Sequence, residues 1–351
     1  MENTNNNFLW PLVGNDNIKE YLTKSIEAGK LAGAYIFSGP SDLGKATTAR
    51  HFAKILHCDK NQAGRPKAPC GKCPSCRSLA LEFHEEAAPE LSRVHADYTV
   101  IEREEGKKHI SIEQVRSLIR KLSMGSFMNS YKIGVIKDAE SLNAEAANAL
   151  LKTLEEPRKK VIVILTTSAP EAMPATIVSR CVVLRFSLVK TSILYDYLLE
   201  KYGVSRGSAK TLSRISLGRS ALAVKFLEDK EYMDRHQQIA IAFYSCFYGN
   251  LIDSFQAIEN LLSKKEGQER VREAENILYV WQAMARDALL LSIGLEDLAS
   301  GVGVKREYEK FMARLSPAGL LRTFERLDQA RSHLYANVNP VTVLQNAVAG
   351  S

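Results

Sequence analysis

The sequence predicts an α/β protein in which a P-loop domain with a parallel sheet precedes an all-helical C-terminal part. Strands alternate with helices through the first half of the 351 residues, and no strand signal follows about residue 187. The motif G-x-x-x-x-G-K at residues 39–45 lies between an apolar run and a helical pattern. That is the setting in which a phosphate-binding loop joins a strand to a helix.

The first elements are read from hydrophobic periodicity. "GAYIFSG" is an apolar run that ends in a glycine turn, and "KATTARHFAKILH" then places Ala49, Phe52, Ala53 and Leu56 on one helical face. "DYTVIER" is typical of a buried strand. These three segments predict strand, helix and strand in chain order.

The next elements continue the alternation. "SIEQVRSLIRKL" begins with the capping-box pair Ser111 and Gln114 and carries an apolar stripe at helical spacing. "YKIGVIKD" predicts a strand, and Pro157 ends the helix "NAEAANALLKTLEE". The β-branched run "KVIVILTTS" is typical of a strand buried on both faces, and "CVVLRF" predicts a further strand.

The length and the polar breaks predict three domains. We place a sheet domain at residues 1–187, a small helical lid at 188–232 and a larger helical bundle at 233–351. The chain has no run of roughly 20 apolar residues, and its polar start resembles no signal peptide, so we expect no membrane contact and a cytoplasmic protein. The net charge of +7 is dispersed and indicates little by itself.

The phosphate loop offers three of the groups that such a site needs. Gly39 and Gly44 let backbone N–H groups turn inward, and Lys45 is placed to reach the β- and γ-phosphates. The alternative is a glycine-rich turn that packs against a helix. ATP or ADP binding therefore remains open.

The groups needed for hydrolysis are incomplete. Ala46 stands where a Ser or Thr hydroxyl would hold Mg²⁺, and Thr47 is rotated by about 100° along the helix. Asp138 is placed as a metal-side carboxylate, but Ala139 follows it where a water-orienting acid belongs. Glu140 is displaced by one position and is otherwise a helix-capping or solvated residue. Efficient hydrolysis is not expected.

A cysteine cluster follows the predicted P-loop helix. The run "PCGKCPSCR" can place three thiolates around one ion, and an earlier cysteine can supply the fourth ligand of a closed, structural Zn²⁺ site spanning residues 58–76. Free thiols are the alternative, and disulfides are disfavoured in a cytosolic protein. The four candidate ligands are Cys58, Cys70, Cys73 and Cys76. Cys181 and Cys246 have no other cysteine nearby in the sequence and are interpreted as small buried residues.

Several segments, in order, resemble the bacterial clamp-loader subunits, the AAA+ proteins of the DNA polymerase III holoenzyme. They are "LVGNDNIKEYL", "AGAYIFSGPSDLGK" with its cysteine insertion, "NALLKTLEEP" and "LTTSAPEAMPATIVSRC". The resemblance covers most of the first 220 residues. It implies an AAA+ domain with a zinc-knuckle insertion, a helical lid, and a C-terminal collar that holds a ring of subunits.

The resemblance also implies roles for single residues. Arg180 of the S-R-C motif would act as an arginine finger in a neighbour's ATP site, although a solvated or intrachain-paired arginine is the alternative. Thr166 or Thr167 would be the sensor residue, and we assign Thr167. Arg219 matches the second-sensor arginine, with a helix-capping arginine as the alternative.

Within this family, the motor subunits (gamma/tau) keep the Ser/Thr and the Asp-Glu pair, whereas the delta-prime subunit has often lost them. Ala46 and Asp138–Ala139 favour the delta-prime side. The implied partners are gamma/tau and delta subunits, with the sliding clamp and primed DNA reached through the complex. An active ATPase subunit of the same machine and a stand-alone zinc-stabilised DNA-binding protein are the alternatives.

Overall fold

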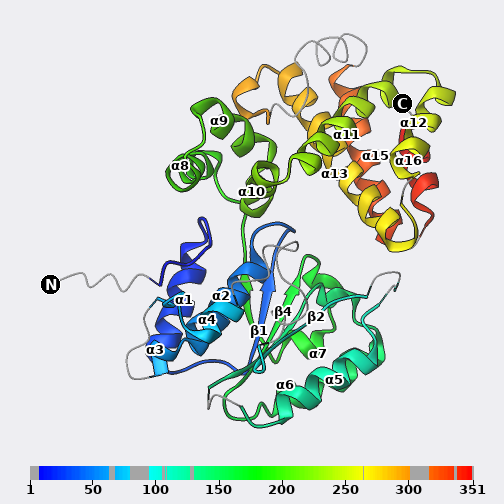
Figure 1. The fold of residues 1–351 in the computed structure, drawn as a ribbon. Coiled ribbons are helices and arrows are strands. Elements are labelled where there is room, and N and C mark those ends of the chain that lie inside the picture. The colour runs from blue at the N-terminus through cyan, green and yellow to red at the C-terminus, as the bar shows by residue number, and fades with distance from the viewer. Residues whose placement is uncertain are drawn as a thin grey trace. The chain divides into compact units, whose positions relative to one another are not determined.

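The computed structural model describes residues 8–62, 68–79, 95–104, 107, 109–126, 130–263, 265–300, 316–335 and 338–349. The chain divides into two compact units (Figure 1). Unit 1 comprises Met1–Lys190 with Arg219–Ala221, and unit 2 comprises Thr191–Gly218 with Leu222–Ser351.

A five-stranded parallel sheet forms the centre of unit 1, in the order β2-β3-β4-β1-β5. The strands are β1 (Ala34–Ser38), β2 (Tyr98–Ile101), β3 (Lys132–Ile136), β4 (Val161–Thr167) and β5 (Val182–Arg185). Each predicted strand is confirmed. All seven residues of the central strand β4 are buried, as its β-branched run predicts.

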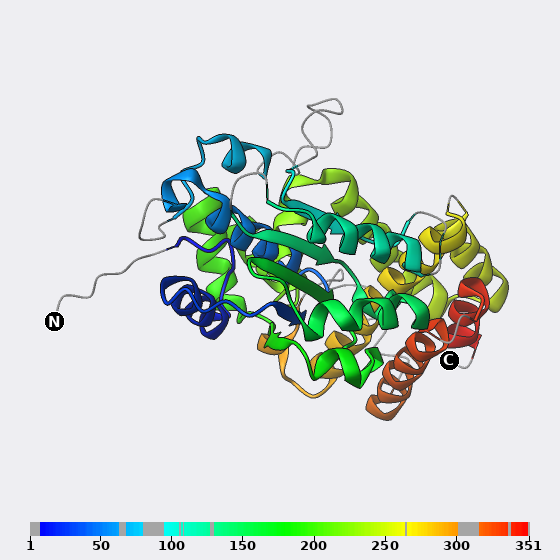
Figure 2. The same ribbon diagram turned by 90° about the horizontal axis from the view of Figure 1, so that it is seen from below.

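Helices cover both faces of the sheet (Figures 1 and 2). The longer helices of unit 1 are α1 (Asp16–Glu27), α2 (Lys45–His57), α5 (Ile112–Ser123) and α6 (Ala144–Glu155). Alternate residues of β1 belong to separate cores: Tyr35 and Phe37 pack with residues of α1 and α2, whereas Ala34 and Ile36 pack with residues of α5 and α6. The short elements are α3 (Asp59–Gln62), α4 (Pro74–Ser78), η2 (Ala139–Ser141), η3 (Pro170–Ala172) and α7 (Ala175–Val178).

Local sequence signals fix the helix ends. The capping box at the start of α5 is present: Ser111 accepts from the Gln114 backbone N–H, and the Gln114 side chain accepts from the Ser111 N–H. Asn143 caps α6, and Pro157 follows soon after its end. These contacts confirm the predicted helix boundaries.

One prediction of burial is corrected. The sequence predicts a buried strand for the segment of β2, but Tyr98 is its one buried residue and the other three are half-buried. The reason is positional, because β2 lies at an edge of the sheet, where a strand has a neighbour on one side alone. The predicted apolar face of α2 is present: Ala49, Phe52 and Ala53 are buried in one core, and half-buried Leu56 packs against the same core.

Unit 2 is helical throughout its described residues. Its elements are α8 (Thr191–Tyr202), α9 (Arg206–Ile215), α10 (Ser220–Glu228), α11 (Lys230–Tyr248), α12 (Leu251–Leu262), α13 (Gly267–Ser292), η4 (Glu296–Leu298), α15 (Pro317–Tyr335) and α16 (Pro340–Ala349). The first residues of α10 belong to unit 1.

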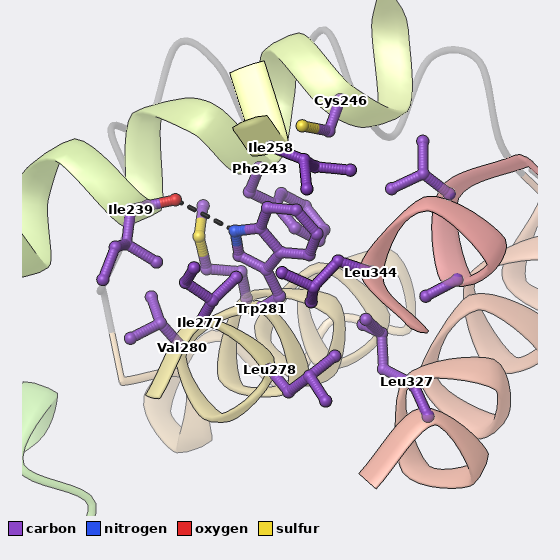
Figure 3. Packing of buried hydrophobic residues seen from close by; sticks show 14 of the residues in the cluster. Ile239, Phe243, Cys246, Ile258, Ile277, Leu278, Val280, Trp281, Leu327 and Leu344 are labelled. Carbon is purple, nitrogen blue, oxygen red and sulfur yellow. Dashed lines mark hydrogen bonds between the residues drawn. The ribbon is translucent and has the colours of Figure 1, made fainter. Parts of the chain in front are cut away.

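Unit 2 contains two hydrophobic cores. The smaller core joins α8, α9 and α10, and the larger joins α11, α12, α13, α15 and α16 around Trp281 (Figure 3). Residue 232, the predicted end of the lid, falls in the first turn of α11. The division into lid and collar stays a prediction. Among the described residues, no helix is long and apolar enough to cross a bilayer.

Candidate phosphate site and cysteine centre

The phosphate loop connects β1 to α2. Gly39 has φ 143°, and a Cβ there would lie 2.3 Å from the Phe186 carbonyl oxygen, so only glycine fits. Gly44 has φ 86° and immediately precedes α2, whose first residue is Lys45. The N-terminus of α2 therefore faces the loop, as an anion-binding site requires.

Lys45 is turned toward its own loop. Its Nζ donates to the carbonyl oxygens of Gly39 (2.5 Å) and Pro40 (2.7 Å). Burial lowers the pKa of Lys45; the carboxylates of Glu140 and Asp138 act in the opposite direction, and the charge of Arg219 adds to the lowering. The predicted residues Asp138 and Arg219 are therefore close enough to Lys45 to influence its charge.

The position after Lys45 supplies no oxygen ligand. Ala46 is the second residue of α2 and is half-buried. The hydroxyl of Thr48 donates to the Gly44 carbonyl at 2.8 Å, so it supports the helix start. Ala46 itself offers nothing to a metal ion.

Asp138 and Glu140 follow the carboxyl end of β3. Asp138 is exposed with φ 51°, and its N–H donates to Thr166 Oγ1 at 3.4 Å. Glu140 Oε1 accepts from the N–H (3.1 Å) and the hydroxyl (2.7 Å) of Ser168, which follows β4. Glu140 is half-buried and bound to the neighbouring strand end, so the expected capping or solvated glutamate is not what the structure contains.

The two sensor candidates lie at the end of β4 and are both buried. Thr166 meets the backbone of Asp138, whereas Thr167 Oγ1 accepts from the Ala169 N–H at 3.1 Å. The segment of Arg219 reaches the phosphate loop through the Ala221 N–H, which donates to the Asp42 carbonyl at 2.9 Å. The two threonines, Asp138 and Glu140 thus lie at the carboxyl edge of the sheet.

Arg180 lies elsewhere. It follows α7 and precedes β5, so it is at the amino edge of a parallel sheet whose carboxyl edge carries Lys45. Its Nε and Nη2 donate to Glu155 Oε1 at 2.9 and 2.7 Å, and its Nη1 donates to the Thr176 carbonyl. About a third of the Arg180 side chain (34%) remains exposed. An exposed pair of this kind contributes about 0–1 kcal/mol to stability.

The four cysteines of the predicted centre converge at the other end of α2. Their Sγ atoms all lie within 4.8 Å of one another. Cys58 and Cys76 are buried, and backbone N–H groups of Cys70, Cys73 and Cys76 each donate to a cysteine sulfur at 3.4 Å. Four convergent sulfurs with N–H donors fit the tetrahedral Zn²⁺ ligand set.

The thiols of this centre differ in their environments. Backbone N–H groups of Lys72 and Cys73 lower the pKa of Cys70 to about 6, whereas burial raises the pKa of Cys58 and of Cys76. A bound cation would offset the burial cost of the thiolates, because metal binding deprotonates its ligands. The two other cysteines differ from each other: Cys246 is buried as expected, but Cys181 is only half-buried.

Purified protein is expected to contain about one Zn²⁺ per chain. Replacing Cys76 with serine should lower the content below half an equivalent and destabilise unit 1, because a structural zinc site contributes folding free energy directly. Elemental analysis with thermal unfolding checks both effects. Cys246→Ser is the matched control and should retain the metal. Equal zinc contents in the two variants would contradict the assignment.

Two pairs of interacting residues are absent from the sequence predictions. Buried Asp97 lies 3.4 Å from Lys132 Nζ and accepts from the Ser126 hydroxyl at 2.6 Å. Glu155, within the "NALLKTLEEP" segment, is the partner of Arg180. Neither pair has a local signal, because each joins residues 25 or more positions apart through the tertiary fold.

The fold and site define a P-loop protein with a parallel sheet, a four-cysteine insertion and an appended helical unit. A family model described as "DNA polymerase III, delta subunit" matches residues 14–190. The DNA polymerase III subunit delta' of Bacillus subtilis is 26% identical over 94% of this chain and 94% of its own length. The tau subunit of the same organism is 24% identical over 96% of this chain, which spans 60% of that protein.

A gamma-subunit-related protein from Thermotoga maritima, of solved structure, aligns over 94% of this chain and 97% of its own with 18% identity and a TM-score of 0.44. The match of the family model to half of the chain establishes the family. The chain belongs to the DNA polymerase III delta-subunit family of clamp-loader proteins and has their α/β AAA+ fold.

Proposed function

We propose that the chain is the delta-prime type subunit of the DNA polymerase III clamp loader, a non-motor component that helps to load the sliding clamp onto primed DNA. Its own contribution to chemistry is Arg180, supplied in trans to the ATP site of a neighbouring gamma/tau subunit. The chain then works in the cytoplasm beside gamma/tau and delta subunits. The family match and the delta' relative support this assignment.

The position of Arg180 carries the proposal. Lys45 and Asp138 follow the carboxyl ends of β1 and β3, whereas Arg180 precedes the amino end of β5. The strands are parallel, and a four- or five-residue strand is about 15 Å long. Arg180 and the phosphate site of this chain therefore lie at opposite edges of the sheet, so Arg180 is not placed to contact a phosphate bound at Lys45. An arginine in that place, exposed and weakly paired, is suited to another subunit's phosphate.

The phosphate site supports the non-motor part of the proposal. Ala46 removes the hydroxyl that would hold Mg²⁺, and Ala139 removes the acid after Asp138. The carboxylate of Glu140, which comes next, is held by Ser168. Nucleotide binding without efficient hydrolysis is the behaviour that these residues favour.

ATP turnover by the purified chain tests this assignment against the second candidate, an active ATPase subunit, which the similarity to the tau relative favours. The non-motor proposal expects no turnover above background, and no effect of Asp138→Asn. Turnover at the rate of a gamma/tau subunit, abolished by Asp138→Asn, would establish the active subunit instead.

A further inference from the structure

The carboxylate of Glu140 is fixed beside the phosphate loop. Its Oε1 accepts two hydrogen bonds from one residue, Ser168, whose N–H and hydroxyl both point at that oxygen. Ser168 directly follows β4, so the carboxylate is tied to the end of a buried strand and cannot swing away freely.

The second carboxylate oxygen of Glu140, Oε2, does not take part in the hydrogen bonds to Ser168. Oε2 is buried and has no hydrogen-bond partner among the residues that the structure describes. A buried carboxylate oxygen without a partner is costly, and it is retained where an opposite charge lies close by. Three carboxylates raise the pKa of Lys45 and so favour its charged form. Glu140 has the largest effect, followed by Asp138 and Asp42.

The phosphate loop lies next to the strand end that holds this carboxylate, because the Gly39 N–H donates to the carbonyl of Thr167, the residue before Ser168, at 3.1 Å. Lys45 donates to the Gly39 and Pro40 carbonyls, so a ligand must break these hydrogen bonds before the ammonium group can reach its phosphate. Among the described residues, the carboxylates of Glu140, Asp138 and Asp42 favour the charged form of Lys45, and the charge of Arg219 opposes it. A terminal phosphate that reaches Lys45 therefore also meets the field of these carboxylates.

We propose that Glu140 sets the ligand preference of the phosphate loop: its fixed carboxylate repels the terminal phosphate of a nucleoside triphosphate and lowers the affinity of the site for it. The inference rests on the proposed function only in taking residues 39–45 as a phosphate loop. Glu140 acts by charge against the ligand and takes no part in bond breaking. A nucleoside diphosphate or pyrophosphate, with less charge at that end, is excluded less strongly.

Calorimetric titration of the isolated chain tests the proposal. ATP, ADP and pyrophosphate are added without magnesium and without a chelator, so that the cysteine centre keeps its metal. Glu140→Gln keeps the size of the side chain and removes its charge, and it is expected to raise the affinity for ATP about tenfold or more, and that for ADP less.

Glu171→Gln is the matched control, because it makes the same substitution at an exposed position of η3, outside the phosphate loop. It should change the ATP affinity less than about threefold, since solvent screens an exposed charge. Ser168→Ala frees the carboxylate without removing it and should raise the ATP affinity by a smaller factor than Glu140→Gln. If Glu140→Gln does not fold, the comparison of Ser168→Ala with Glu171→Gln decides the question.

Three outcomes would overturn the inference. They are equal ATP affinities of the wild type and Glu140→Gln, no measurable binding to either, and an equal gain in Glu171→Gln. The titration uses the isolated chain, whereas the supply of Arg180 is measured in the assembled complex. Failure of the inference therefore leaves the proposed function standing, and failure of the proposed function leaves the titration interpretable.

Discussion

Replacing Arg180 with alanine is expected to lower ATP turnover about a thousandfold at the neighbouring site that it serves, because an arginine finger stabilises charge on the transferring phosphate. The chain itself should stay folded and assembled. Its ion pair with Glu155 is exposed and contributes about 1 kcal/mol or less. Turnover of the reconstituted complex, with thermal unfolding of the isolated variant, measures both effects.

Two further variants make this experiment specific. Arg206→Ala removes an exposed arginine at the first position of α9, in the other unit, and should leave turnover unchanged. Glu155→Gln removes only the charge of the ion-pair partner of Arg180 and should lower turnover far less than the loss of the arginine. Unchanged turnover in Arg180→Ala, or an equal loss in Arg206→Ala, would end the assignment of a finger.

Replacing Trp281 with alanine is expected to cost about 3–5 kcal/mol of the free energy of unfolding of unit 2, because it leaves a cavity in the larger helical core. Trp281 is fully buried on α13, and its Nε1 donates to the Ile239 carbonyl at 3.0 Å (Figure 3). Its ring meets Phe243 and Phe247 edge-on. Truncation therefore also leaves a carbonyl without its donor.

Urea unfolding followed by circular dichroism measures this loss, since tryptophan fluorescence would change with the residue itself. Ile252→Ala is the control: this side chain is 80% exposed on α12 and should contribute less than about 0.5 kcal/mol. A loss of less than about 1 kcal/mol in Trp281→Ala would contradict the packing described for the larger core.

The parts of the fold that depend on local signals could be predicted from the sequence. The capping box of Ser111 and Gln114 lies within one helical turn, and the β-branched run of β4 marks a strand buried on both faces. The cysteine centre is similar, because the close spacing of residues 70–76 restricts where three sulfurs can lie. In each case the residues concerned are close together in the sequence, so local geometry largely determines where they lie.

The parts that depend on strand order could not be predicted in the same way. The sequence of β2 is typical of a buried strand. Its position at the edge of the sheet depends on which strands pair, and there it has a neighbouring strand on one side alone. Glu140 meets Ser168 because β3 and β4 are neighbours, and nothing near Glu140 in the sequence indicates that contact. The same holds for Glu155 and Arg180.

A structure of the assembled clamp loader with a non-hydrolysable ATP analogue tests the central claim most directly. The account predicts the Arg180 guanidinium within about 3 Å of the γ-phosphate held by the neighbouring subunit, and no coordinated magnesium beside Lys45 of this chain. Magnesium and ATP fully coordinated at Lys45, with a water in line for attack and Arg180 still bound to Glu155, would contradict it.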